Sequence, residues 1–195
     1  MVITVRQRQY AIGLAGTGRG ELVTENIWTC TGFLGIDDRS GVAFLCHLNT
    51  PWCAFALPEV VADLRKHVTD LCSFRLYTVA GIRPELTWGL ILVAGVLMVA
   101  DQWSWGLAFL AAALMFSITR LHLRYQLWRL KAFGSKPISL GHSSARFGFG
   151  MCGVRVDPKT RKTPEPYSYG RRRDYERFKE PKWWGFRMTK AEDSA

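Results

Sequence analysis

The chain lacks the cysteine patterns that mark a metal site or a disulfide framework. It has five cysteines, an odd number, and no two of them are spaced as a CxxC pair. Four of the five stand in apolar segments, which is typical of reduced cysteines in a cytosolic protein. We therefore expect no bound metal and no cofactor. The five are Cys30, Cys46, Cys53, Cys72 and Cys152.

The first ten residues also lack the apolar stretch of a cleavable signal peptide, so we expect none there. Acidic residues are few, with 16 Asp and Glu against 26 Lys and Arg and a net charge of +10. The basic excess follows Arg120, and it fits either an anionic membrane surface or nucleic acid. Because it directly follows an apolar segment, we favour anionic lipid as a partner and do not expect nucleic acid.

Charge is almost absent between Leu86 and Thr119, where Asp101 is the only charged residue. This block has 34 residues, whereas one straight membrane-spanning helix needs roughly 20. A transmembrane helical hairpin that turns at Asp101 and Gln102 is the simplest prediction. The alternative is a buried hairpin of a soluble protein, and the missing polar face argues against it.

The arginines that follow the apolar block predict how the hairpin is oriented. By the positive-inside rule, both termini and the catalytic domain should lie on the cytoplasmic side of the inner membrane, with Asp101 outside. Residues 120–132 should continue the second helix as a basic, amphipathic segment near the lipid headgroups.

Outside this block, the hydrophobic pattern predicts an α+β fold, layered as a sheet or β-sandwich with a packed helix. The Gly-rich segment 13–20 lacks the Lys-Ser/Thr ending of a phosphate-binding loop, so a plain flexible loop is expected there. Strands are predicted at 2–12, 27–36, 42–48, 75–80, 137–140 and 147–156, and a helix is predicted at 57–74.

Three residues carry the candidate chemistry: Thr24, Cys30 and His47. Cys30 ends a strand-like segment that begins at Thr24, and His47 follows seventeen positions later in a second one. On paired strands, the His47 imidazole can take the Cys30 thiol proton and leave a nucleophilic thiolate. The even spacing from Thr24 to Cys30 places both on one face of a regular strand, where the Thr24 hydroxyl can orient the imidazole. Cys46, next to His47, should point to the opposite face and belong to the core.

These offsets, with Thr six residues before the Cys and His seventeen after it, resemble the chemoreceptor glutamine deamidase family, CheD. The bacterial cytotoxic necrotising factors share the catalytic fold of that family. The surroundings agree, with Gly20 before the strand, an acidic turn at 37–38 and Pro51 after the His. The resemblance covers roughly residues 8–82 and resumes at 138–162.

The resemblance implies a CheD-like catalytic domain that the hairpin interrupts. It divides the chain into the first part of the domain at 1–84, the transmembrane hairpin with its basic extension at 85–132, closing strands at 133–165, and an irregular basic and aromatic tail at 166–195. Residues 27–29 depart from the family, which has small Gly and Ser residues before its Cys.

By the same resemblance, the chain would be a bacterial, membrane-anchored cysteine hydrolase. It would convert a glutamine side chain of a partner protein to glutamate at the membrane. Cys30 would attack the amide carbon, His47 would transfer protons, and Thr24 would hold His47. Two alternatives stay open: a non-catalytic membrane adaptor that keeps the fold as a binding module, and a secreted effector toxin with the same chemistry.

Overall fold

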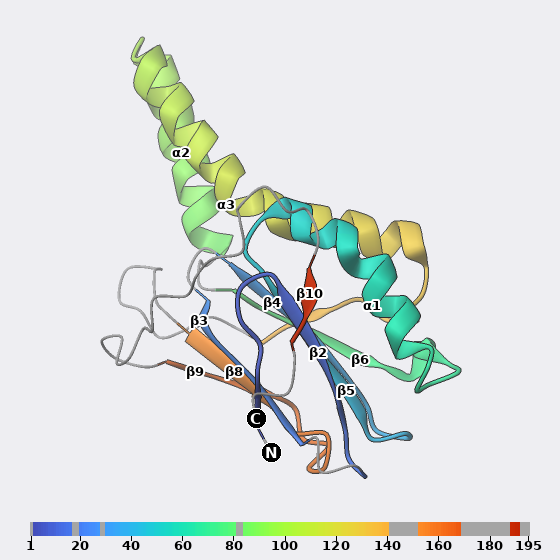
Figure 1. Cartoon of the computed structure of the whole chain (residues 1–195). Helices are drawn as coiled ribbons and strands as arrows, with labels where there is room; N and C mark the ends of the chain where they lie inside the picture. Colours follow the sequence, from blue (N-terminus) through green and yellow to red (C-terminus); the bar gives the residue numbers. More distant parts are fainter. Residues whose placement is uncertain are drawn as a thin grey trace.

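The strands of this computed structural model form two sheets that pack face to face, with helices on the outer side of the larger sheet (Figure 1). The structure describes residues 2–16, 20–27, 30–80, 84–140, 152–168 and 188–191. Within these residues, one sheet has six strands and the other has four. The predicted α+β class is confirmed.

The six-stranded sheet is covered on both faces. Its strands, in spatial order, are β10 (Thr189–Lys190), β2 (Gln9–Leu14), β5 (Val42–Leu48), β4 (Thr31–Asp37), β6 (Arg75–Ala80) and β7 (Ile138–Ser139). Every residue of β4 and β5 is buried. Phe33 and Phe44 face the helices, whereas Leu34 and Leu45 face the smaller sheet. Burial on both faces explains why these two strands read as continuous apolar runs in the sequence.

The four-stranded sheet consists of β1 (Val2–Thr4), β3 (Glu21–Ile27), β8 (Cys152–Val156) and β9 (Glu165–Ser168). The single strand predicted at residues 2–12 is therefore wrong, since β1 and β2 belong to different sheets. The chain changes sheet at a turn in which Arg8 has a φ of 61°. This turn lets the N-terminal segment contribute to both layers.

The helix predicted at 57–74 is shorter than expected. A 3-10 helix, η1 (Pro51–Ala56), leads directly into α1 (Leu57–Leu64), and a second 3-10 helix, η2 (Leu71–Ser73), follows separately. Asp70 begins the separate turn η2, because its side chain accepts a hydrogen bond from the Cys72 backbone N–H at 2.9 Å.

The apolar block forms the predicted hairpin of helices, α2 (Pro84–Val99) and α3 (Trp103–Leu130), and it turns at Asp101. In Figure 1, α2 and the first part of α3 project from the body, whereas the rest of α3 crosses the helical side of the six-stranded sheet beside η1. Leu123 and Leu127 there pack on the core. The prediction that residues 120–132 lie at the headgroups is thus wrong for their inner face, which packs on the protein.

The helices give no support, by length and hydropathy together, to the prediction that the hairpin crosses a membrane. Among the described residues, no single helix has both the length and the hydropathy of a membrane span. Two parts of α3, Trp103–Leu114 and Ser117–Leu130, reach these criteria only together, and a bend of 42° separates them.

The residues after the hairpin return to both sheets. β7 pairs with β6 in the larger sheet, and β8 pairs with β3 in the smaller one. Both predicted closing strands are therefore present in the part of each that the structure describes, but they belong to different sheets. The tail predicted to be irregular from residue 166 contributes β10, which pairs in parallel with β2. That prediction is wrong at these residues, because the open edge of β2 gives even a short segment backbone partners.

Candidate active site

Thr24 and His47 meet between the two sheets. Thr24 is in β3 of the smaller sheet and His47 is in β5 of the larger one, and both side chains are buried. Thr24 Oγ1 lies 2.7 Å from His47 Nδ1. The sequence predicts Thr24 and Cys30 on one face of a single strand, and the structure contradicts this. β3 ends at Ile27, and Cys30 lies just before β4 in the opposite sheet.

A backbone carbonyl decides which nitrogen of His47 carries a proton. The Thr24 hydroxyl donates to the carbonyl oxygen of Val5 at 2.7 Å. Since this uses the only hydroxyl proton, Thr24 Oγ1 must accept from Nδ1–H of the imidazole. The remaining nitrogen, Nε2, therefore presents its lone pair. The sequence could not identify Val5, because its contribution is a main-chain atom.

Burial keeps His47 neutral. Desolvation lowers the pKa of His47 to about 4, so the imidazole is an uncharged base at neutral pH. Its Nε2 atom is buried and has no hydrogen-bond partner within the described part of the chain. A buried nitrogen in this state is available to accept a proton from a group that approaches it.

Strand register puts Cys30 on the same side of the sheet as His47. Gly32 is the direct partner of His47 in the β4–β5 ladder, and Cys30 is two residues before Gly32. Side chains two residues apart on an extended chain share a face. Cys30 accordingly belongs to the core between the sheets, with Leu34 and Leu45 as members of the same cluster. The thiol and Nε2 share this layer without a hydrogen bond between them.

Cys46 is buried on the other face of β5, as its position next to His47 predicts. Burial raises the pKa of the Cys46 thiol, and the nearby Cys53 raises it further, which keeps Cys46 protonated and unreactive. Cys53 and Cys152 are also buried. Cys72 is exposed, unlike the other four cysteines.

The other two described histidines have no place in this constellation. His67 is exposed after α1, and His122 lies on α3, where it packs against Phe55. His142 lies outside the described residues, and so do Trp28 and Thr29, two of the residues at which the sequence differs from the CheD-like pattern. Among the described side chains, no three His, Cys, Asp or Glu residues come together as a metal site would require.

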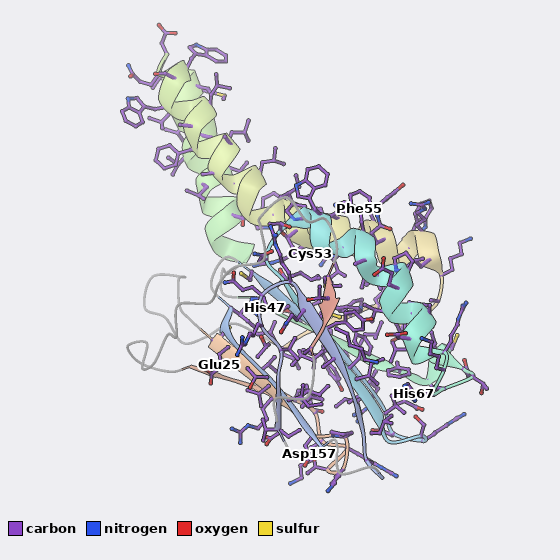
Figure 2. The ribbon with its side chains drawn as sticks, in the orientation of Figure 1. Glu25, His47, Cys53, Phe55, His67 and Asp157 are labelled. Atoms are coloured by element: carbon purple, nitrogen blue, oxygen red, sulfur yellow. The ribbon has the colours of Figure 1, made fainter. Side chains whose placement is uncertain are left out.

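Figure 2 shows His47 in the interior of the body, near the end from which the hairpin projects. The candidate base, the group that would orient it and the candidate nucleophile thus come from β5, from β3 and from the residue just before β4. A search against protein-family models and a search of curated proteins both find no match to this chain. Its function therefore has to be argued from this geometry and from the resemblance in the sequence.

Proposed function

We propose that the chain is a cysteine-dependent hydrolase of amide bonds, with Cys30 as nucleophile, His47 as base and Thr24 as the group that orients the base. One observation carries this proposal. A chain of two hydrogen bonds, from Thr24 to the Val5 carbonyl and from His47 to Thr24, leaves a buried Nε2 with no hydrogen-bond partner among the described residues, on the sheet face that also carries Cys30.

The chemistry follows the ordinary course of a Cys–His pair. His47 Nε2 takes the Cys30 thiol proton, and the thiolate adds to the amide carbon. The carbon–nitrogen bond then breaks, and the proton on Nε2 leaves with the departing ammonia. A water molecule, deprotonated by Nε2, attacks the thioester, so that a carboxylate forms and the proton returns to the thiol. A neutral imidazole held in one tautomer suits both steps.

The CheD-like spacing extends this to the side chain of glutamine in a partner protein. Because the departing group would be ammonia, the protein backbone of the substrate is left intact and only one neutral side chain becomes negatively charged. The CheD-like identity of the fold, with the hairpin as an insertion between β6 and β7, is part of the same proposal.

We also propose that the α2–α3 hairpin holds the enzyme on an anionic membrane, at the cytoplasmic face of the inner membrane. Small residues face the contact between the two helices, where Ala94 and Ala113 are buried and Gly106 approaches the Ala94 carbonyl closely. Large apolar side chains such as Leu92, Val96 and Val99 point outward. Helix pairs in lipid are built this way, whereas a soluble pair would bury its large residues.

Thiol reactivity tests the catalytic proposal. Cys30 should react with iodoacetamide at neutral pH faster than the exposed Cys72, although Cys30 is buried. His47→Ala should slow this labelling, and Thr24→Val should slow it as well, because the imidazole loses the acceptor for Nδ1–H. Thr24→Ser, which keeps the hydroxyl, is the matched control and should restore the rate. Equal rates in the wild type and in His47→Ala would show that no activated pair exists.

A non-catalytic adaptor is the second candidate, and one observation favours it. Within the described residues, the Cys30 thiol donates no hydrogen bond to His47 Nε2. If Cys30 reacts no faster than Cys72 in the folded protein, this second reading replaces the enzyme.

A further inference from the structure

A continuous series of aromatic rings crosses the helical side of the body. Trp52 and Phe55 of η1 stack with ring centroids 6.0 Å apart, and Phe55 meets His122 of α3 edge-on at 4.3 Å. The series continues from His122 to Tyr125 at 6.3 Å and from Tyr125 to Trp128 at 6.2 Å. We call these five residues the aromatic face. Figure 2 shows Phe55 beside α3 at the upper side of the body.

The aromatic face is largely open to solvent in the described structure. The exposed fraction is 70% for Trp128, 52% for Tyr125, 51% for Trp52 and 47% for Phe55. Single exposed apolar residues are common on protein surfaces, but a contiguous apolar patch marks a site of interaction. The contact between η1 and α3 therefore has an outer side that the body does not cover.

The second part of α3 has two different faces. Leu123 and Leu127 point toward the core, whereas the exposed positions of this part recur at helical spacing on the other side. These exposed positions are Ile118, Leu121, Arg124, Tyr125, Trp128 and Arg129. Tyr and Trp with arginines at their side form the composition of a helix at the water–lipid boundary, where the rings lie among the headgroups and the guanidinium groups pair with phosphates.

We infer that the aromatic face is a second membrane contact, which lies in the headgroup layer of an anionic bilayer and holds the body against it. The inference rests on the proposed membrane association of the hairpin. Two features favour a bilayer over a protein partner. The aromatic face shares helix α3 with the hairpin, which carries large exposed apolar side chains. Arg124 and Arg129, which are exposed on the same side of α3, and the net charge of +10 complement anionic lipid.

This contact fixes where the candidate active site lies relative to the membrane. η1 begins at Pro51, four residues after His47. On the neighbouring strand, Thr31 follows Cys30 and pairs with Ala80, and α2 begins at Pro84 soon after. Both membrane contacts therefore leave the body at the end that carries Cys30 and His47. The substrate amide would have to be presented beside the headgroups, as in the membrane-adjacent segment of a membrane-bound protein.

A fluorescent probe at two positions of the full chain tests the inference. Cys30→Ala and Cys72→Ser first remove the candidate nucleophile and the exposed thiol. An environment-sensitive dye is then attached to a new cysteine, either Leu121→Cys on the exposed side of α3 or Lys159→Cys. Lys159 is in the turn that follows β8, next to Asp157, which Figure 2 shows at the end of the body away from the hairpin. Vesicles of phosphatidylcholine and phosphatidylglycerol, with a nitroxide on the headgroup, are floated with each labelled protein.

We expect the dye at position 121 to shift to shorter wavelength and to lose intensity through the nitroxide, while the dye at position 159 does neither. Replacing Tyr125 and Trp128 together by alanine should weaken the quenching at position 121, and the control Val2→Ala, on exposed β1, should not. Protein that floats with the vesicles while both dyes stay unquenched overturns the inference and leaves the hairpin association standing. Protein that does not float overturns both.

A further outcome identifies a different occupant. If the dye at position 121 becomes shielded without vesicles, and more so at higher protein concentration, a second copy of the chain covers the aromatic face, and the inference is wrong.

Discussion

The body and the hairpin distribute their apolar side chains in opposite ways. In the body, the large apolar groups between the sheets and under the helices, such as Phe33 and Phe44, are completely buried. In the hairpin, Ala94 is 2% exposed, whereas Val99 is 91% exposed. The core of the body is thus removed from water by the protein itself, whereas the large apolar side chains of the hairpin stay exposed in the described structure.

Truncating one large apolar side chain in each region tests directly whether the two regions differ in how much such a side chain stabilises the fold. The ring of Phe44 packs against three other rings, with centroid distances of 5.2 Å to Phe33, 5.7 Å to Phe74 and 5.9 Å to Phe133. Phe44→Ala removes this ring and should lower the free energy of unfolding by about 3–5 kcal/mol. The matched change Leu92→Ala on α2 should alter it by no more than about 0.5 kcal/mol. Urea unfolding in mild detergent measures both, and equal losses would mean that the outer side of the hairpin is packed like a core.

The interior of the body should also respond to pH in a way that the hairpin does not. His47 has its pKa lowered to about 4 by burial, and the unfolded chain has the ordinary value of 6.5. Below about pH 6.5, the unfolded chain binds a proton at His47 that the folded protein does not bind. The free energy of unfolding therefore decreases toward pH 4 by on the order of 3 kcal/mol.

His47→Gln should remove this part of the pH dependence. The melting temperature between pH 4 and pH 8, measured for the wild type and the variant, isolates the effect, because all other titrating groups are common to both. His67→Gln, the same substitution at an exposed position, is the matched control. A wild-type slope that persists in His47→Gln would contradict the assignment of the buried neutral base.

The close contact between the hairpin helices should be sensitive to side-chain size at one glycine and not at another. A Cβ atom at Gly106 would lie 2.7 Å from Met98 Cγ and 3.0 Å from the Ala94 carbonyl oxygen, whereas at Gly95 nothing lies within 4 Å. Gly106→Leu should therefore separate the helices at a cost of about 1–3 kcal/mol, and Gly95→Leu should not. Hydrogen exchange of residues 87–114 in micelles reports the difference, and equal protection in the two variants would contradict the small-residue contact.

The smallest expected effect concerns a polar contact at the rim of the body. Tyr10 donates a hydrogen bond to Asp63 at 2.7 Å, and Lys66 pairs with the same carboxylate at 2.6 Å. Tyr10→Phe should cost about 1 kcal/mol, because Asp63 keeps its lysine partner. Tyr125→Phe on the exposed side of α3 is the control. Denaturant unfolding compares them, and a larger loss for Tyr125→Phe would argue that the helix surface is covered within the protein.

Part of the fold could be predicted from local pattern. The turn at Asp101, strand β6 and the continuous apolar strands β4 and β5 follow from runs of residues that are contiguous in the sequence. The boundary between α1 and η2 could not be predicted, because it depends on the Asp70 side chain capping a new turn. β10 also escaped prediction, since two residues form a strand only where an edge such as β2 offers backbone partners.

For the candidate site, the sequence by itself determined which residue types stand at which offsets: a Thr, a Cys and a His whose spacing singles them out. It could not place Thr24, because an even spacing gives one face only if the strand continues, and here the chain crosses to the other sheet before Cys30. Only the tertiary structure joined Thr24 to His47 across the two sheets, brought in the Val5 carbonyl that selects the tautomer, and buried the imidazole deeply enough to keep it neutral. The physical reason is that desolvation and hydrogen-bond geometry depend on neighbours from distant segments, whereas spacing along the chain records only the local backbone.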